Sequence, residues 1–556
     1  MDHCFARVYK SRHNYIFLKI LDLSPAVKIC TPQESLKNKP KINDVYQVKL
    51  LNKHIKNKQL CNLIKKIDLE REKYDLARII AKHSLPPQHP DYPELKGIEK
   101  NIPPQEFNNR KNLKELLTIT IDGQHAKDFD DAISIESHKD NYKIYIHIAD
   151  VSAVISPNSP LDLEASKRAT SFYLGNYVIP MFPPKISNDL CSLKEKQDRL
   201  TITIEITFNS KLEIINTDFY RSLINVNKRL TYQEAHQIIS SSPSSKLDET
   251  LKKMYQLSSK LFNKRLKNGR LDLNLPDYEL IYEKNRIKEI NLLKRLKSHV
   301  VIEEFMLSAN LVIAKILKDH KIPTLYRTHE KISQENINSL KNFLKIFRLK
   351  IPKKENMDQA LQKILTNIKG HKNEKVINFV ILTSLMQANY QPKPLGHFGL
   401  GFKDYTHFTS PIRRYPDLIV HRSLKSLIDH QPPPYSINEL NELGIYSSEM
   451  ERVAQRAERD LFKIKACHLM KNRIGETFSG LISGLAKIGF FVALHDEPIE
   501  GLVPLKYLTN DYYLLKEDEY SIVGRKQGKR FRLGDEIKVR LIKADPETIQ
   551  IDFEPV

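Results

Sequence analysis

Cysteine is scarce in this chain. Five cysteines occur among 556 residues, and no two of them lie two or four positions apart. This spacing argues against the paired ligands of a zinc knuckle and against a disulfide framework. We therefore interpret the cysteines as reduced thiols and expect a cytoplasmic protein.

Long hydrophobic runs are also missing. No uninterrupted apolar segment approaches the ~18 residues that a membrane-spanning helix needs. The best candidate, residues 300–317, contains two glutamates and has the pattern of an amphipathic helix. The first residues, MDHCFARVYKSRHNY, lack the apolar core of a signal peptide. We therefore expect no membrane-embedded segment and no membrane partner. There is also no Gly-x-x-x-x-Gly-Lys-Ser/Thr phosphate loop, so we do not expect nucleoside triphosphate hydrolysis.

Positive charge, by contrast, is in excess. Lys and Arg number 89 against 67 Asp and Glu, giving a formal net charge of +22. Such a surplus indicates a polyanionic partner, either nucleic acid or an anionic membrane. Coding bias is an alternative explanation, because the chain is also rich in Ile and Asn.

The order of strand-like and helical patterns predicts a multidomain chain. At roughly 150 residues per domain, the length alone suggests three or four domains. Strand patterns within 117–222 and around 278–291, followed by helical periodicity at 299–320, 418–428 and 446–470, predict one α+β domain. Short strands at both ends predict small all-β barrels of the OB type. The predicted parts are a barrel over 1–75, a linker over 76–116, the α+β domain over 117–470 and a second barrel over 475–556.

One short loop gathers negative charge within this basic chain. The segment IDGQHAKDFDDAISIE, residues 121–136, contains Asp122, Asp128, Asp130 and Asp131 between two strand-like runs. Carboxylates this close repel one another unless a cation lies among them. Oxygen-only clusters suit Mg²⁺ or Mn²⁺, whereas the spacing lacks the order of a calcium-binding EF-hand. The sequence therefore predicts a divalent metal site, with a solvated acidic turn as the alternative.

Two further segments carry candidate binding residues. In GHFGLGFKDYTHFTSPIRRYPDLIVHR, residues 396–422, Arg413 and Arg414 follow Ser-Pro and should lie near a helix N-terminus, a favourable place for phosphate. Guanidinium groups bind phosphate oxygens bidentately. In residues 166–193, Tyr173 could stack on a nucleobase. Local pattern alone leaves a solvated face open as the alternative for the arginines, and it favours core packing over stacking for the tyrosine.

These stretches together resemble the RNase II / RNase R (RNB) family of processive 3′-to-5′ exoribonucleases. The carrying segments are TIDGQHAKDFDDA, YIHIADVS, DLEASKRATSFYLGNYVIPMFPPKISNDLCSL, VIEEFMLSAN, residues 396–422 and AERD, in the family's order. Residues 475–554 resemble the S1-type OB module, and the N-terminal barrel resembles a cold-shock domain. The order of barrel, catalytic RNB domain and barrel is similar to bacterial RNase R, although that enzyme usually carries two cold-shock domains.

The resemblance implies a role for each candidate residue. It implies that Asp122, Asp128, Asp130 and Asp131 hold Mg²⁺, with Mn²⁺ as a second option, and that Asp130 and Arg413 are catalytic. It implies RNA contacts for Tyr173, Arg414 and Glu458, and for Glu303 or Glu304, whose register stays open. The family's clamp phenylalanine has no clear counterpart, since residues 269–278 offer leucines instead.

The expected activity is hydrolysis of RNA from its 3′ end to nucleoside 5′-monophosphates. The expected partner is single-stranded RNA with a free 3′ end, with ribosomes or RNA-decay factors as further candidates, and we expect a monomer. Two alternatives stay open: a catalytically weak RNA-binding regulator with the same fold, and a metal-dependent deoxyribonuclease. The sequence does not separate enzymes that unwind duplexes from those that stall before them.

Overall fold

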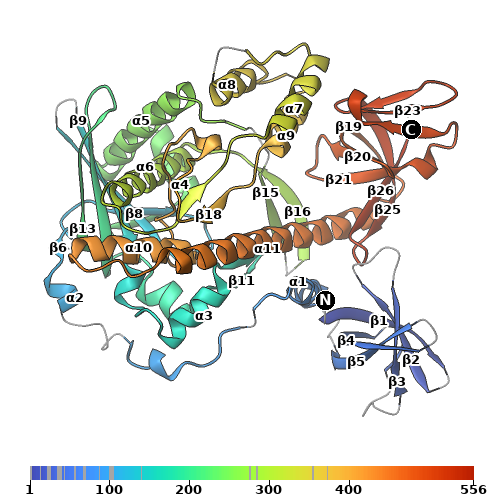
Figure 1. Ribbon diagram of the computed structural model, residues 1–556, viewed down its shortest axis with the longest axis horizontal. Helices are drawn as coiled ribbons and strands as arrows, with labels where there is room; N and C mark the ends of the chain where they lie inside the picture. The colour runs from blue at the N-terminus through green and yellow to red at the C-terminus, as the bar shows by residue number, and fades with distance from the viewer. Residues whose placement is uncertain are drawn as a thin grey trace.

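The computed structural model has a large mixed domain on one side and two small barrels on the other, where a long helix that leaves the mixed domain ends (Figure 1). The described residues are 3–12, 14–21, 27–33, 40–42, 44–55, 58–66, 71–86, 88–98, 105–138, 141–273, 277–283, 286–352, 356–371 and 373–556. No helix among them is long and apolar enough to cross a bilayer.

The N-terminal barrel closes in the strand order β1-β2-β3-β5-β4. Its strands alternate apolar and polar residues, as a half-buried strand requires. In β2, Ile16 and Leu18 are buried in the barrel core while Lys19 is exposed. The strands are β1 His3–Arg12, β2 Tyr15–Ile20, β3 Lys28–Pro32, β4 Val45–Ile55 and β5 Lys58–Lys66.

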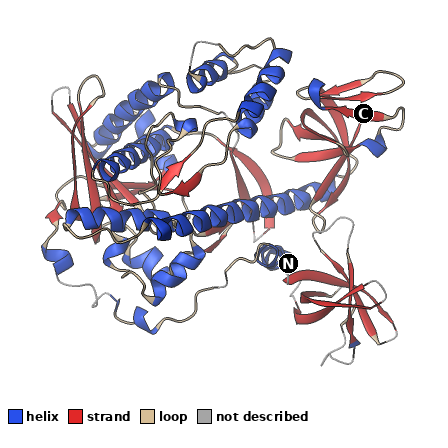
Figure 2. Ribbon diagram, in the orientation of Figure 1, coloured by secondary structure: helices blue, strands red, loops and turns tan. Residues whose placement is uncertain are grey.

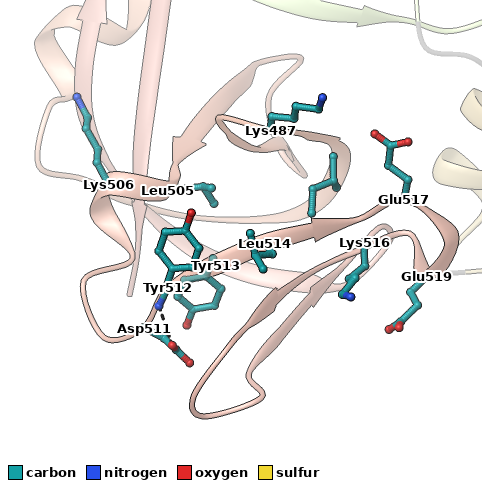
Figure 3. A pocket seen from close by; sticks show the side chains of 11 residues that line it. Lys487, Leu505, Lys506, Asp511, Tyr512, Tyr513, Leu514, Lys516, Glu517 and Glu519 are labelled. Carbon is teal, nitrogen blue, oxygen red and sulfur yellow. Dashed lines mark hydrogen bonds between the residues drawn. The ribbon is translucent and has the colours of Figure 1, made fainter.

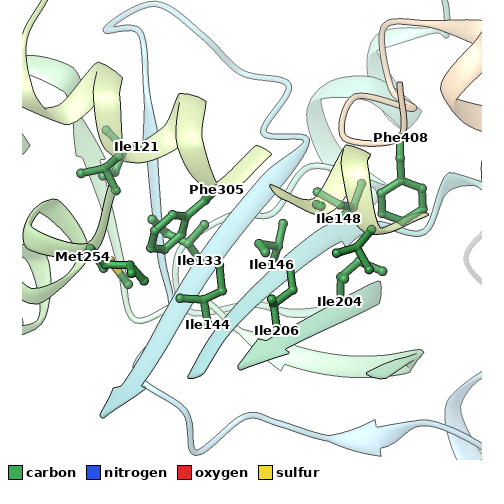
Figure 4. Packing of buried hydrophobic residues seen from close by; sticks show 14 of the residues in the cluster. Ile121, Ile133, Ile144, Ile146, Ile148, Ile204, Ile206, Met254, Phe305 and Phe408 are labelled. Atoms are coloured by element: carbon green, nitrogen blue, oxygen red, sulfur yellow. The ribbon is translucent and has the colours of Figure 1, made fainter. Parts of the chain in front are cut away.

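A seven-stranded sheet forms the centre of the middle domain, in the order β14-β7-β8-β9-β12-β13-β6. Rows of isoleucine at alternate positions of β9 and β12 make one face continuously apolar (Figure 4). The strands are β6 Lys111–Asn112, β7 Ile119–Asp122, β8 Asp131–His138, β9 Asn141–Ala149, β12 Asp198–Phe208, β13 Ile214–Asn225 and β14 Lys228–Thr231. This rigid sheet determines where the loop between β7 and β8 lies.

Helices cover the apolar face of the sheet. Met254 of α5 and Phe305 of α6 pack on the isoleucine rows, and both side chains are fully buried (Figure 4). The helical pattern expected at 299–320 is confirmed by α6, with one end shifted by two residues. The helices on this face are α4 Tyr232–Ser240, α5 Lys246–Lys267 and α6 Lys297–Asp319.

The opposite face of the sheet buries polar groups, several of which hydrogen-bond one another. The ring of His147 bonds Ser134 at 3.1 Å and Thr203 at 2.7 Å. Burial lowers the pKa of His147 to about 3, so the ring stays neutral within this network. Arg110, just before the edge strand β6, donates to the buried Asp150 carboxylate at 2.7 Å, which ties this edge of the sheet to the end of the interior strand β9.

The remaining elements frame the domain. Helix α11 has 34 residues, which at 1.5 Å per residue spans about 50 Å from the middle domain to the C-terminal barrel (Figure 1). The other elements of this part are α1 Arg71–Lys82, α2 Gln105–Asn108, α3 Pro160–Arg168, β10 Phe172–Leu174, β11 Tyr177–Ile179, β15 Asp277–Glu283, β16 Arg286–Leu293, β17 Tyr326–Thr328, α7 Gln334–Ile346, α8 Met357–Asn367, α9 Glu374–Ser384, β18 Asn389–Gln391, α10 Tyr415–Ile428 and α11 Ile437–Met470.

The C-terminal barrel closes in the order β19-β20-β21-β26-β25 and carries an inserted three-stranded sheet, β22-β23-β24. Strands dominate both ends of the chain and helices the middle (Figure 2). The strands are β19 Thr477–Ala486, β20 Gly489–Leu494, β21 Glu500–Pro504, β22 Tyr513–Lys516, β23 Ser521–Gly524, β24 Arg530–Arg532, β25 Glu536–Asp545 and β26 Gln550–Pro555.

The architecture confirms the expected α+β domain with flanking barrels and differs from the sequence reading in two details. Residues 76–116, read as a linker, contain most of α1, all of α2 and the sheet strand β6. Helix α10 starts at Tyr415 with Pro416 in its first turn, so Pro411 lies before the helix instead of inside it. Arg413 and Arg414 therefore immediately precede the helix N-terminus.

Candidate metal and nucleic-acid site

The acidic loop is held at both ends by the central sheet. Asp122 is the last residue of β7, and Asp131 is the first residue of β8, where it pairs with Ile148 of β9. The Ala149 N–H donates to the Asp130 carbonyl oxygen at 2.9 Å. Because both ends belong to strands, the loop that carries Asp128 and Asp130 has fixed endpoints.

Ser192 holds the middle of the same loop. Its hydroxyl donates to the Lys127 carbonyl oxygen at 2.7 Å and accepts the Phe129 N–H at 3.1 Å. The side chain is fully buried and follows a π-helical turn, Ile186–Leu190. Such turns are frequent at functional sites. The sequence analysis quoted this residue within SNDLCSL but assigned it no role.

Asp130 joins the acidic loop to the segment that contains the two arginines. It is 4% exposed, its Oδ1 accepts the Ile412 N–H at 2.8 Å, and its Oδ2 lies 3.3 Å from Arg413 Nε. Ile412 and Asp130 are 282 positions apart in the chain, so this hydrogen bond brings the two predicted motifs together at one carboxylate.

The cluster carries more negative charge than its surroundings offset. Burial, and then repulsion from Asp131 and Asp130, raises the pKa of Asp122 to about 8. Burial raises the pKa of Asp131 to about 6 although Arg413 and Arg414 oppose the shift. Burial also raises the pKa of Asp130 well above its usual value. A bound cation would lower these pKa values, because it stabilises the charged carboxylates.

The residues present fit a divalent cation. Oδ2 of Asp122 and Oδ2 of Asp130 are buried and have no hydrogen-bond partner among the described residues. Within those same residues, no three His, Cys, Asp or Glu side chains converge into a complete ligand set. Mg²⁺ matches this arrangement, because it keeps several waters and takes one or two carboxylates together with substrate phosphate oxygens.

Tyr173 and Arg413 border the acidic cluster and remain accessible. The Tyr173 hydroxyl donates to Asp128 Oδ2 at 2.8 Å, and the residue is 37% exposed on the β10–β11 hairpin. Burial of the hydroxyl and the neighbouring Asp128 raise the pKa of Tyr173, so the phenol keeps its proton. The Arg413 side chain is 41% exposed, and its guanidinium donates to Ser410 Oγ at 2.9 Å.

Arg414 has a different environment from its neighbour. Its guanidinium donates to Oδ1 of the fully buried Asp417 at 2.7 Å, and the same oxygen accepts the Ser410 N–H at 2.8 Å. Arg414 thus secures the start of α10. Its predicted contact with RNA is neither supported nor opposed by this ion pair.

The three predicted glutamates lie on two helices. Glu304 of α6 is fully buried, with Oε2 3.0 Å from Arg265 Nε. Glu303 is half-exposed, pairs with Arg270, and lies 2.5 Å from Arg295. Of this pair, Glu303 therefore presents the more accessible carboxylate. Glu458 is exposed on α11.

An open pocket of about 850 Å³ lies elsewhere, in the C-terminal barrel (Figure 3). Lys487, Lys506 and Tyr512 are among its lining residues, and none of the predicted site residues is. The acidic cluster is therefore located by its chemistry and not by this cavity.

Comparison with known proteins decides the family. The RNB domain model matches residues 110–430, and the S1 RNA binding domain model matches residues 471–554. The chain belongs to the RNB family. The acidic loop, Ser192 and the Arg413 segment all lie within the matched RNB domain.

Individual RNB relatives cover most of the chain. Ribonuclease R of Aquifex aeolicus is 38% identical over 488 residues, 86% of this chain and 69% of that protein. Ribonuclease R of Thermotoga maritima is 37% identical over 505 residues, 87% of this chain and 71% of that protein. The fold matches Mycoplasma genitalium RNase R in complex with ribose methylated single-stranded RNA, with a TM-score of 0.91 and 24% identity, over 100% of this chain and 90% of that one.

Proposed function

We propose that this RNB family member is a metal-dependent 3′-to-5′ exoribonuclease that degrades single-stranded RNA processively to nucleoside 5′-monophosphates. The observation that carries the proposal is the position of Asp130. A buried carboxylate with an oxygen that lacks a hydrogen-bond partner faces the accessible Arg413 within the RNB domain. The 37–38% identity to proteins named Ribonuclease R supports the same activity.

The aspartates would hold the divalent cation beside the last phosphodiester bond. A cation bound there supplies charge stabilisation at the phosphate and lowers the pKa of a coordinated water. Asp130 is positioned for this by the Ile412 N–H, and the loop by Ser192. Arg413 can bind the non-bridging phosphate oxygens and stabilise the charge that develops on them.

The remaining residues would bind and orient the strand. Tyr173 can stack on the terminal base, and its hydroxyl contact with Asp128 fixes the ring next to the cluster. The net charge of +22 attracts the phosphate backbone at a distance. Stacking and charge do not distinguish bases, so we propose degradation without sequence preference.

A catalytically weak RNA-binding regulator is the second candidate. Its support is limited to the fold and the S1 domain, which an inactive protein would also have. All four aspartates and Arg413 are present, and a protein without catalysis has no need for a buried carboxylate oxygen that lacks a partner. The active enzyme is therefore the better supported proposal.

A degradation assay separates these candidates. The purified chain is incubated with uniformly labelled single-stranded RNA, a 3′-tailed RNA duplex and single-stranded DNA, each with Mg²⁺ or with a chelator. We expect mononucleotides from single-stranded RNA with Mg²⁺ only. Intact RNA under all conditions would support the regulator, and comparable DNA degradation would support the deoxyribonuclease. The tailed duplex reports whether the enzyme unwinds or stalls.

Tyr173 should contribute mainly through its ring. Tyr173→Ala should weaken binding of the RNA 3′ end by about 1–3 kcal/mol, the usual value of one base–aromatic stack. Tyr173→Phe should retain most of that affinity and lose only the hydroxyl contact with Asp128. Fluorescence anisotropy with a chelator present measures both. Equal losses in the two variants would contradict stacking.

Ser192 should act on the metal site without touching it. Ser192→Ala removes both hydrogen bonds to the loop, and outer-shell changes of this kind typically weaken metal binding by about 10–100-fold. The measurement is the Mg²⁺ concentration that gives half-maximal activity. Ser187→Ala is the matched control, since Ser187 is buried in the same π-helical turn but bonds Asn188. An unchanged Mg²⁺ requirement in Ser192→Ala would refute the role.

Several further assignments belong to the proposal. Mg²⁺ is the preferred ion, with Mn²⁺ as the alternative. Arg414, Glu303 and Glu458 are proposed RNA contacts, ribosomes or RNA-decay factors are candidate partners, and the protein is proposed to be a cytoplasmic monomer. The division into residues 1–75, 76–116, 117–470 and 475–556 is likewise a proposal.

A further inference from the structure

Helix α1 lies where both barrels meet the end of α11 (Figure 1). Arg78 of α1 is 1% exposed. Its guanidinium donates to the carbonyl oxygens of Pro546 and Glu547, each at 2.9 Å. Both residues belong to the turn between β25 and β26 of the C-terminal barrel. A buried guanidinium that binds two main-chain oxygens in a fork fixes both position and orientation.

The N-terminal barrel is attached to the same turn. Arg7 of β1 forms an ion pair with the Glu547 carboxylate. Tyr74 and Ala81 of α1 pack with Phe5, Leu21 and Val45 of the barrel. Since α1 moves with the N-terminal barrel, Arg78 is a direct link between the two ends of the chain.

Helix α1 is also fixed to α11. Asp75 Oδ2 lies 3.0 Å from Lys465 Nζ and 2.9 Å from His468 Nε2, with Asp75 and Lys465 both buried. About two turns further along α1, Lys82 pairs with Asp460 of α11 at 3.0 Å. These ion pairs hold α1 on α11 independently of Arg78, and the end of α11 packs in the core of the C-terminal barrel. Loss of Arg78 should therefore leave both barrels attached and free only the β25–β26 turn from α1.

Both barrels offer surfaces for single-stranded RNA. On the N-terminal barrel, the half-buried rings of Tyr9 and Phe17 lie 6.5 Å apart, with the Lys58 ammonium 4.5 Å from the Phe17 ring. Aromatic rings beside lysines suit stacked bases and phosphates. The C-terminal barrel matches the S1 RNA binding domain model.

We propose that Arg78 is a positioning residue that joins the two barrels into one RNA-guiding unit and thereby makes degradation depend on RNA length. This inference rests on the proposed ribonuclease activity. Two binding modules held in a fixed relative orientation lose less freedom when one strand binds both of them than modules whose orientation varies. An RNA long enough to reach the barrels gains this affinity, whereas an RNA that ends inside the RNB domain does not.

The test compares Arg78→Ala with wild type on two RNAs. One RNA has about 4 nucleotides, the lower limit for a single OB barrel, and the other exceeds about 32 nucleotides, twice the upper limit. We expect the KM for the long RNA to rise severalfold, because the barrels stay attached and lose only their fixed relative orientation. The kcat for both RNAs, and the KM for the short RNA, should stay unchanged.

Two further variants separate positioning from general destabilisation. Arg7→Ala breaks the accessible pair with Glu547 and a contact with Tyr74, and it should raise the KM for long RNA by a smaller factor than Arg78→Ala. Arg540→Ala removes an exposed ion pair with Glu554 within the C-terminal barrel, and it should change the KM for neither RNA. If Arg78→Ala raises the KM equally for both RNAs, or leaves the KM for the long RNA unchanged, the proposal is overturned.

Binding measurements keep the inference separate from the proposed activity. With a chelator present, the dissociation constant of the long RNA should rise in Arg78→Ala, while that of the short RNA should not. If wild type proves inactive, the exoribonuclease proposal fails but this difference in affinity still decides the role of Arg78. Identical long-RNA affinities for wild type and Arg78→Ala would reject it.

Discussion

Asp130→Asn should abolish RNA hydrolysis and leave RNA binding nearly intact. The substitution keeps the size of the side chain and the oxygen that accepts the Ile412 N–H, but removes the charge facing Arg413. Loss of metal-derived charge stabilisation amounts to several kcal/mol, which corresponds to a fall in kcat on the order of 10³-fold. Single-turnover hydrolysis and binding with a chelator present measure the two effects separately.

A matched variant controls for the loss of one negative charge. Asp189→Asn also removes an aspartate near the RNB site, but Asp189 is solvent-accessible and pairs with Lys185 and Lys194. It should hydrolyse RNA at close to the wild-type rate. Wild-type hydrolysis by Asp130→Asn would show that the catalytic assignment is wrong.

Arg413→Ala should slow cleavage by about 10²–10³-fold, the range found when one donor to a transition-state oxyanion is removed. RNA affinity should fall only modestly, because one cation among many contributes to backbone binding. Arg413→Lys should recover little activity, since an ammonium cannot reproduce the two-pronged geometry of guanidinium.

The role of Arg413 is decided by comparing the loss of kcat with the loss of RNA affinity in the same variant. A purely structural arginine would reduce hydrolysis and RNA affinity together, because Ser410, its hydrogen-bond partner, lies at the start of the α10 segment. Arg221→Ala is a suitable control, since Arg221 pairs with Asp429 on the sheet edge and should affect neither quantity.

Local patterns were sufficient to predict the elements that carry the site. Alternating apolar residues predicted β7 and β8, which hold Asp122 and Asp131, and helical periodicity predicted α6 and α10. The period of each pattern reports which face is buried, and burial dominates folding. The family resemblance then connects the acidic loop with Arg413, whose Nε lies 3.3 Å from Asp130 Oδ2 in the structure.

Contacts between distant segments could not be read from the sequence. The Ile412 N–H that binds Asp130, and the Ser192 hydroxyl that binds the loop, depend on tertiary packing. Adjacent helical residues face different directions, which is why Glu303 is accessible and Glu304 is buried. The proline-rich stretch at 82–95 indicates a linker by its composition. The predicted boundary between residues 75 and 76 consequently falls within α1.

We propose that the four aspartates of the acidic loop hold divalent metal against the end of an RNA strand. Anomalous X-ray scattering from crystals of the full chain with Mn²⁺ and a hydrolysis-resistant RNA tests it directly. We predict a metal peak bound by the aspartate oxygens between β7 and β8, adjacent to the terminal phosphate. Ordered RNA in the site with no metal peak among these carboxylates, at millimolar Mn²⁺, would contradict it.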